Sequence, residues 1–333
     1  MNNQNTHWAG LDPNRRERFE RAINVSGAGS ILVQNFTNRV IQQLSIREQG
    51  ALATLDRRPG SGSQAVVNRR TGSSMTATDV WVADTDSLTE SSGTYSQATF
   101  TYRTLATRGK LTRKMRAIGR SYIDILAEEM LQKADDWNEA LESALFIGDS
   151  AAVTQQIDGL LTLINAASGQ VVAQTSAVGG DDLSLSKLDE TIDTVKGAGN
   201  RSDLVIYTSF LGGRKLNAAL DSRQRFMETT EIAAGFRVRS YDGIPIVVST
   251  GLGDDLTWDG SNVTGLSGES TNPTTAIVIV NKRHFWIEEL TQMTMMPLAR
   301  DDSQFEQFDI YADLALVQHN TLGGALLGGI SIT

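Results

Sequence analysis

The sequence predicts an α+β fold with a long projection, and three features of the chain support this prediction. Residues 57–109 are rich in Ser, Thr, Gly and Arg and contain only short strand-like patches. Residues 112–147 then have the periodicity of one long helix. Strands and helices alternate over residues 183–250, and strands dominate after residue 276. Because a two-stranded ribbon is only marginally stable alone in water, the projection is expected to lie on a neighbouring subunit.

Composition excludes several classes of protein. The chain has 333 residues, of which 40% are hydrophobic and 21% charged, as in ordinary globular proteins. It has no cysteine, which excludes disulfides, zinc–thiolate sites, iron–sulfur clusters and cysteine nucleophiles. We find no basic segment followed by an apolar one at the N-terminus, and no apolar run of about 18 residues. We therefore expect synthesis in the cytoplasm and no contact with a membrane.

Charge is distributed unevenly along the chain. Residues 1–120 carry 17 Lys and Arg against 9 Asp and Glu, whereas residues 121–333 carry 13 against 30. A basic front half on an acidic body suits either binding of nucleic acid or head-to-tail attraction between copies. Solvated faces that happen to segregate are a third interpretation. The sequence pI near 5.0 argues against a dedicated DNA-binding protein.

The N-terminal part is polar and then helical. A short charged stretch includes four arginines that are candidates for non-specific contact with DNA, namely Arg15, Arg16, Arg18 and Arg21. Apolar residues at helical spacing predict a helix from Ser30 to Leu44, either as a core helix or as a subunit-contacting arm. Ala51–Leu55 is expected to form a short strand before the break at residues 59–63.

The projection itself carries the candidate inter-subunit contacts. Asp79–Val82 and Thr99–Arg103 are expected to pair as its two strands, with aromatic side chains that stack across the ribbon or dock on a neighbour. Every basic residue between 57 and 109 is an arginine, the residue that best forms bidentate pairs with carboxylates, although the arginines are also compatible with simple solvation. The predicted contact residues are Arg57, Arg58, Arg69, Arg70, Trp81, Phe100, Tyr102 and Arg103.

The predicted long helix follows at once. Apolar residues spaced by three and four run from Ile118 to Leu145, and an unbroken helix over Thr112–Ile147 spans roughly 54 Å at ~1.5 Å per residue. Thr112 is the candidate N-cap, and Gly148 stands where a glycine commonly ends a helix. The helix has many carboxylates without a histidine, so a solvated outer face is favoured over a metal site.

The later segments predict a compact α/β unit and a β-rich end. An apolar segment at residues 157–165 is followed by a polar linker. Helices are expected at residues 183–195 and 212–221, and strands at 203–208, 243–250, 276–280, 285–290, 291–298 and 308–317. Residues 251–275 are expected to form a polar loop. Because strands lie at both ends of the α/β part, we expect the first and last thirds of the chain to share a sheet and helix platform.

Signatures of catalysis and cofactor binding were not found. The glycine pairs lack the third glycine of a dinucleotide-binding loop, and there is no nucleophile elbow and no zinc-protease motif. His7, His284 and His319 lie far apart in the sequence and are expected to be ordinary residues. Asp254, Asp255 and Asp259 lack the spacing of a calcium loop, so a solvated loop is favoured. We predict no catalytic, cofactor-binding or metal-binding residues and no enzyme activity.

The order of elements resembles a known family, the tailed-bacteriophage major capsid proteins with the Hong Kong 97 type of fold. The resemblance rests on a colinear set of segments: residues 31–44 (ILVQNFTNRVIQQL) and 51–55, the projection, the long helix, its exit ALFIGD with DGLL at 158–161, YDGIPI at 241–246, and the closing strands through Leu316. None of these short motifs is specific alone.

The resemblance implies a domain organisation. It implies an N-terminal arm (1–50), an extended loop (51–110), a peripheral domain with a spine helix (111–165), an axial domain (166–275) and peripheral return strands (276–333). It also implies self-assembly through pentameric and hexameric capsomers into an icosahedral or prolate shell around double-stranded DNA. The extended loop would reach over an adjacent subunit.

The resemblance also implies partners and a location. A portal protein and packaged DNA are expected, with a possible decoration protein, in a virion capsid assembled in the host cytoplasm. Some relatives join loop lysines covalently to neighbours, but residues 57–109 contain no lysine, so we expect a non-covalent shell. Because only 29 residues precede Ser30, a separate scaffolding protein is expected. An encapsulin-type compartment shell and a soluble α+β enzyme remain alternatives.

Overall fold

The computed structural model describes residues 50–73, 92–119, 125–195, 201–221, 228–233, 236–265, 272–298 and 304–332, together with residues 81, 84 and 90. The predictions for Arg15, Arg16, Arg18 and Arg21, and for the helix at residues 30–44, lie outside these described residues.

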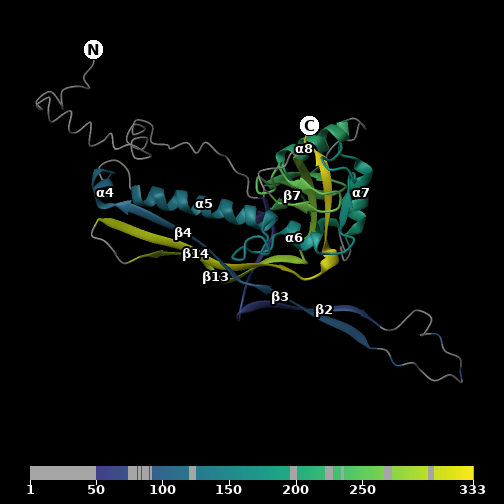
Figure 1. The fold of residues 1–333 in the computed structure, drawn as a ribbon, viewed down its shortest axis with the longest axis horizontal. Coiled ribbons are helices and arrows are strands. Elements are labelled where there is room, and N and C mark those ends of the chain that lie inside the picture. The colour runs from purple at the N-terminus through teal and green to yellow at the C-terminus, as the bar shows by residue number, and fades with distance from the viewer. Residues whose placement is uncertain are drawn as a thin grey trace, which may run out of the picture.

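A four-stranded sheet combines strands from the first and last thirds of the chain. Its strand order is β1 (Asp56–Pro59), β13 (Phe285–Pro297), β14 (Phe305–Gln318) and β4 (Arg103–Thr112). Helix α5 (Ile125–Ile147) runs lengthwise along this sheet (Figure 1). The core includes Leu141 and Leu145 of the helix and alternate residues of β14 from Phe308 to Leu316. The expectation that the first and last thirds share a platform is therefore confirmed.

A seven-stranded sheet forms the second part of the molecule. Its order is β5 (Val171–Ala173), β15 (Gly324–Ser331), β12 (Thr274–Asn281), β6 (Leu204–Thr208), β9 (Ile244–Val248), β8 (Phe236–Tyr241) and β7 (Glu228–Ala233). Helices α7 (Leu185–Thr194) and α8 (Phe210–Asp221) pack on one face. The other face meets α6 (Leu160–Asn165) and the core of the four-stranded part. Every residue of β12 is buried, because successive side chains enter opposite cores.

Two short connections tie the sheets together. Residues 282–284 lead from β12 to β13, and residues 319–323, which include the short helix η2 (Thr321–Gly323), lead from β14 to β15. Strands β12 and β15 pair within the seven-stranded sheet. Strands β12 and β15, both close to or beyond residue 276, therefore belong to the seven-stranded sheet.

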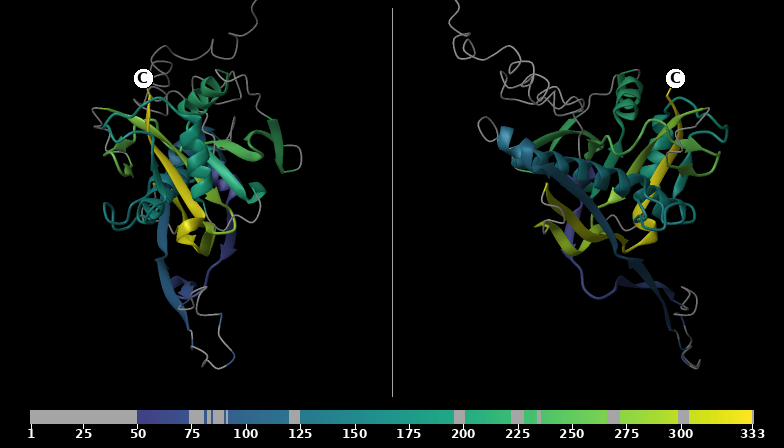
Figure 2. Two further views of the ribbon diagram at one scale, coloured as in Figure 1. Left: turned by 90° about the vertical axis from the view of Figure 1, so that its right-hand side faces the viewer. Right: turned by 60° about the vertical axis from the view of Figure 1, so that its left-hand side comes forward.

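The projection is a two-stranded antiparallel ribbon of β2 (Gln64–Ser73) and β3 (Gly93–Thr101). It extends away from both sheets in every view (Figures 1 and 2). The expected ribbon is confirmed, but its pairing differs from the prediction. Thr99 pairs with Val66 rather than with the segment 79–82, of which only Trp81 is described, and Trp81 lies outside the strands. The sequence analysis did not predict a strand at Gln64–Ser73 (QAVVNRRTGS), which forms β2.

The helix predicted at Thr112–Ile147 is described as two helices, α4 (Arg113–Gly119) and α5, with residues 120–124 outside the described part. The N-cap prediction is correct, because Thr112 Oγ1 accepts a hydrogen bond from the Met115 amide at 3.3 Å. Gly148 follows the last helical residue as expected, but for another reason. A Cβ there would lie 2.3 Å from the Ile157 carbonyl oxygen, so close backbone packing requires the glycine.

Three further predictions need correction. Ala51–Leu55 is not a strand but lies largely within helix α3 (Gly50–Thr54). Strands β7, β8 and β15 were not predicted. The expected polar loop at residues 251–275 contains a small hairpin of β10 (Thr257–Trp258) and β11 (Val263–Thr264), with Trp258 almost wholly buried.

A buried carboxylate explains why α3 is helical. Glu142 of α5 is 1% exposed and accepts hydrogen bonds from the Ala51 amide at 2.8 Å and the Leu52 amide at 2.9 Å. These amides belong to the first turn of α3 and have no partner within that helix. Glu142 also accepts a bond from the Ser249 hydroxyl at 2.6 Å, just beyond strand β9. One side chain thus joins the base of the projection, helix α5 and the seven-stranded sheet.

Replacing Glu142 tests this junction. Because Glu142→Ala leaves two amides and one hydroxyl buried without an acceptor, we expect the free energy of unfolding to fall by about 3–5 kcal/mol. Glu142→Gln, which keeps one carbonyl oxygen, should cost about half as much. The measurement is urea denaturation of the full chain. Asp135→Ala, at an exposed carboxylate on the same helix, is the matched control and should change stability by less than about 0.5 kcal/mol. Equal effects of E142A and D135A would contradict the assignment.

Candidate assembly surfaces

The ribbon is fixed to the body by a small hydrophobic cluster, which we call the ribbon root. Ala65 and Val67 of β2 are buried against Trp286 of β13 and Val317 of β14. Phe100 and Tyr102, two of the predicted contact residues, pack half-buried against the same cluster. The base of the projection therefore has a core within its own chain, unlike the expectation that the whole segment lacks one.

Tyr102 is held at the ribbon root by polar contacts as well. Its hydroxyl donates a hydrogen bond to Glu288 Oε1 at 2.5 Å. Its ring lies over Gly60, where a Cβ would come within 2.6 Å of the hydroxyl oxygen. Burial, followed by the hydrogen bond to Glu288, raises the pKa of Tyr102 to about 12. Tyr102 is therefore a neutral donor at physiological pH, and its contact is within one chain.

Three of the predicted arginines also contact their own chain. Arg57 pairs with Glu289 at 3.1 Å. The guanidinium of Arg58 lies 4.0 Å from the centre of the Trp286 ring, a cation–π contact. Arg69 Nη2 donates to the Gln318 carbonyl oxygen, and burial lowers the pKa of Arg69. These three side chains attach the base of the projection to the four-stranded sheet.

The distal part of the ribbon offers the exposed side chains. Trp81 is 86% exposed and Arg70 is exposed, so these two predicted residues are open to a partner. Two exposed residues that were not predicted lie on the same ribbon, Val66 and Tyr95, which is 74% exposed. The sequence analysis missed Val66 and Tyr95 because it placed the two strands of the ribbon at residues 79–82 and 99–103. Arg103 lies half-buried at a cavity of about 90 Å³ beside Asp158.

The face of the four-stranded sheet that carries Arg108 and Asp309 is rich in charge. These two side chains form a bidentate pair at 2.7 and 2.9 Å, and this hydrogen bonding lowers the pKa of Asp309. On the opposite face of β14, Arg116 of α4 contacts Glu306 at 2.5 Å. Beyond β1, which pairs with residues 286–289 only, β13 exposes four large apolar side chains. They are Leu290, Met293, Met295 and Met296, each 40–46% exposed.

The two histidines expected to be unrelated are brought together. The pairing of Phe285 with Gln318 places His284 beside His319, and their rings stack with centroids 5.7 Å apart. They adjoin the ribbon root rather than a cleft. His7 lies outside the described residues.

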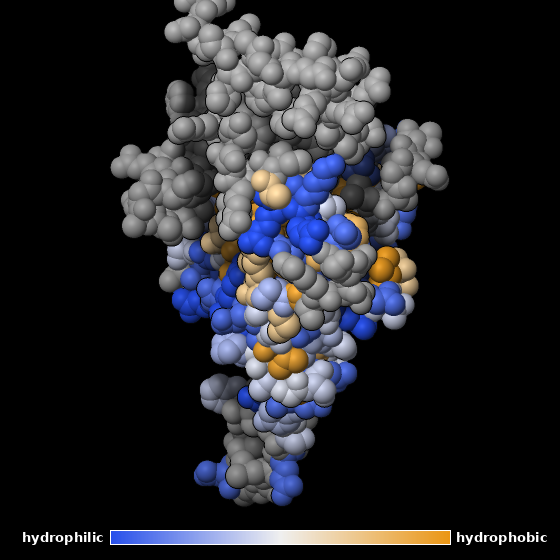
Figure 3. Space-filling view, turned by 90° about the vertical axis from the view of Figure 1, so that its left-hand side faces the viewer, coloured by the Kyte–Doolittle hydropathy of each residue, from blue (hydrophilic) through white to orange (hydrophobic). Residues whose placement is uncertain are grey.

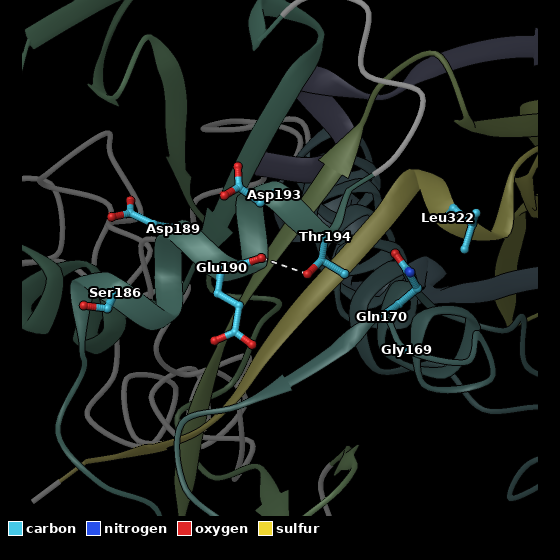
Figure 4. Close-up of a pocket in the computed structure, with 8 residues that line it drawn as sticks. All are labelled: Gly169, Gln170, Ser186, Asp189, Glu190, Asp193, Thr194 and Leu322. Carbon is cyan, nitrogen blue, oxygen red and sulfur yellow. Dashed lines mark hydrogen bonds between the residues drawn. The ribbon is translucent and has the colours of Figure 1, made fainter.

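An open hollow of about 700 Å³ lies beside α7 (Figure 4). Asp189, Glu190 and Asp193 line it, but the first two are engaged, Asp189 with the Tyr241 hydroxyl at 2.6 Å and Glu190 with Lys187 at 2.8 Å. Among the described residues that line the hollow there is no histidine.

In the polar loop at residues 251–275, Asp259 accepts hydrogen bonds from the Asn262 and Ser261 amides. These bonds lower the pKa of Asp259 and close the turn that it begins.

The face of the molecule seen in Figure 3 is largely hydrophilic where it is described, with a few isolated hydrophobic patches. Within the described ranges, no helix combines the length and apolar character needed to cross a bilayer. Nor do the described residues bring together three side chains able to hold a metal ion.

Comparison with known proteins gives a consistent answer. The model of the phage capsid family matches residues 29–310. Among solved structures, the capsid of a native GTA particle is 17% identical, with a TM-score of 0.63 over 92% of this chain and 98% of that one. A structure from Gordonia phage Cozz is 14% identical, with a TM-score of 0.58 over 86% of this chain and 88% of that one. The SrpI encapsulin of Synechococcus elongatus PCC 7942 is 14% identical, with a TM-score of 0.62 over 91% and 96%. No curated protein sequence matches.

Tyr102→Phe tests the ribbon root. Loss of the bond to Glu288 should weaken ribbon attachment by about 1 kcal/mol, or about fivefold in the hydrogen-exchange protection of β2 and β3 amides. Because the pKa of Tyr102 is raised, this contribution is complete below pH 10 and is lost as the pH rises from about 10 toward 12. Exchange at pH 7 and pH 9 should therefore show the same loss. Tyr95→Phe, at the exposed tyrosine on β3, is the control; an equal effect there would refute the assignment.

Proposed function

This chain belongs to the phage capsid family, and from that premise we propose that copies of it close into a non-covalent shell around double-stranded DNA. Its fold is of the Hong Kong 97 type, as in the capsid structures it resembles. In the proposed shell, the subunits form pentameric and hexameric capsomers. The unit around the seven-stranded sheet then serves as the axial domain, and the unit around α5 and the four-stranded sheet as the peripheral domain.

The observation that carries the proposal is the exposed ribbon. Beyond the ribbon root, β2 and β3 pair only with each other in the described structure, and Trp81 and Tyr95 are 86% and 74% exposed. Large exposed aromatic side chains are typical anchors of protein interfaces. We place the partner surface for this ribbon on the body of an adjacent subunit.

Charge and apolar contact both contribute to the proposed interface. Arg70 of the ribbon meets a body whose residues after 120 are strongly acidic. Exposed ion pairs are individually worth only about 0–1 kcal/mol, so apolar contacts must supply most of the affinity. The exposed apolar residues of β13, such as Met293 and Met296, offer such contacts. Electrostatic attraction then orients the subunits as they meet.

The proposed shell has no covalent bonds between its subunits. Residues 57–109 contain no lysine, and the first lysine, Lys110, has its ammonium group 3.8 Å from the centre of the Phe305 ring of its own chain. The remaining partners are proposed from the family. They are packaged DNA, contacted non-specifically by Arg15, Arg16, Arg18 and Arg21, and a separate scaffolding protein, a portal protein and a decoration protein, in a virion assembled in the host cytoplasm.

A compartment shell of the encapsulin type is the second candidate. It is favoured by the fold likeness to the SrpI encapsulin, which covers 91% of this chain. The family match and the phage capsid structures support the virion instead. A catalytic role has the least support, because the described histidines and the hollow beside α7 lack the arrangement that such a role needs.

Assembly can be measured directly. We expect the full chain, expressed alone and with its neighbouring genes, to form closed particles or capsomer rings by light scattering and negative-stain microscopy. On a boiled denaturing gel, the particles should give a single band near 36.1 kDa. A ladder of larger species would reject the non-covalent shell, and a uniform monomer or dimer in every condition would reject the shell altogether. Particles filled with DNA distinguish the virion from a protein-filled compartment.

Shortening the ribbon tests its role in assembly. Deleting residues 71–94 and joining Arg70 to Tyr95 through Asn-Gly keeps the ribbon root and closes the remaining strands with a favoured two-residue turn. The body should keep its unfolding transition to within about 1 kcal/mol, since none of the described residues in the removed segment belongs to the buried core. Shell formation should be lost. Trp81→Ala should weaken shells without changing subunit stability. Normal shells from the shortened chain would contradict the proposed role of the ribbon.

A further inference from the structure

The charged residues that line the hollow beside α7 are all acidic. Asp193 lies three residues after Glu190 and four after Asp189, so the three carboxylates share one exposed face of the helix. Figure 4 shows Gln170, which directly precedes β5, and Leu322, from η2, on the other side of the hollow. The volume of about 700 Å³ lies within the range of sites that hold small ligands or single side chains.

Gln170 brings a hydrogen-bond acceptor to the hollow. The residue is 4% exposed, and its side-chain Oε1 atom has no hydrogen-bond partner in the described structure. Its backbone is fixed, because its amide donates to the Ala167 carbonyl at 3.3 Å and its carbonyl accepts from the Leu326 amide at 2.9 Å. In Figure 4 its amide group points into the space between Thr194 and Leu322. A buried acceptor without a donor is costly, and the last torsion of a glutamine is soft, so a small rotation can offer this oxygen to an N–H group in the hollow.

The carboxylates of the hollow have room for a further donor. The Tyr241 hydroxyl donates to Oδ1 of Asp189 at 2.6 Å, and Lys187 donates to Oε2 of Glu190 at 2.8 Å, so each of these bonds uses one of two carboxylate oxygens. Asp193 is exposed at the same face of α7. None of the described residues that line the hollow is basic. The hollow therefore has negative charge that Lys187, outside the lining, offsets only in part.

We propose that the hollow beside α7 is a binding site for an arginine side chain of another polypeptide chain. A guanidinium has five N–H donors in a flat fork and no acceptor, so one group can donate to Gln170 and to a carboxylate at the same time. An ammonium group is a compact point charge without this fork, and an anion is repelled by the three carboxylates. The apolar stem of the arginine packs on Leu322, which is 40% exposed.

The experiment is an NMR titration of the full-length chain with the capped peptide acetyl-Gly-Arg-Gly-amide, at a protein concentration at which light scattering detects no particles. We expect saturable shifts of the α7 amides and of the Gln170 side-chain amide. The same peptide with citrulline, the neutral isostere of arginine, should bind at least about tenfold more weakly, because hydrogen bonds to charged groups are the stronger ones. Spermidine is the probe for a free oligoamine, the other source of such a cation.

Variants separate a binding role of these side chains from a structural one. Gln170→Met keeps the length of the side chain but removes its acceptor, and should weaken binding of the arginine peptide at least about tenfold. Asp193→Asn should weaken it about threefold. Lys187→Met removes the cation that competes for Glu190 and should tighten binding about twofold, which damage to the fold cannot do. Asp135→Asn, at an exposed carboxylate of α5, is the control and should bind as the wild type.

Three results would overturn the proposal. They are no binding of the arginine peptide, equal binding of the citrulline peptide, and wild-type affinity in both Q170M and D193N. Spermidine binding at these residues without binding of the arginine peptide would assign the hollow to a free oligoamine and would also overturn it. If Q170M does not fold, D193N and K187M, whose substitutions lie on the exposed side of α7, still decide the outcome. Because unassembled subunits suffice, the outcome is independent of shell formation.

Discussion

A carboxylate removed from water must find a hydrogen bond for each of its oxygens, and Glu142 meets this requirement with donors from two other parts of the molecule. The first-turn amides of α3 and the hydroxyl of Ser249 supply those bonds. A buried carboxylate without hydrogen-bond donors would cost several kcal/mol, so the loss of either set of donors would lower the free energy of unfolding substantially. The chain where the projection begins, the long helix and the seven-stranded sheet are therefore fixed relative to one another. The neighbouring backbone shares the constraint, since a Cβ at Gly251 would lie 2.8 Å from the Glu142 carbonyl oxygen.

The projection that begins at this junction has two parts, which differ in what their side chains contact. Near the body, the ribbon uses its side chains for its own chain, through Trp286, Tyr102 and Arg69. Further out, its aromatic residues have no described core and remain available to another subunit. This division corrects the expectation that the whole segment lacks a core, and only its distal part is proposed to serve assembly. The arginine content alone could not separate the arginines that contact their own chain, such as Arg69, from those that are exposed, such as Arg70.

Regular periodicity made much of the fold predictable from the sequence. Helix α7 and strands β6, β12 and β14 have clear patterns and lie where expected. Strand β15 (GALLGGIS) was missed because its glycines resemble those of a loop. Their reason is tertiary: a Cβ at Gly328 would lie 2.5 Å from the Trp258 ring. Helix α3 depends on a carboxylate 91 residues away, and the histidine pair depends on strand register. Neither of these two contacts can be predicted from local sequence patterns.

The two connections between the sheets have a kinematic consequence. The chain passes from one sheet to the other at residues 282–284 and returns at residues 319–323, and a backbone hydrogen bond holds these crossings side by side. Two adjacent crossings define an axis instead of a single pivot. Together with the hydrophobic core that both sheets share, they resist twisting and shear between the sheets.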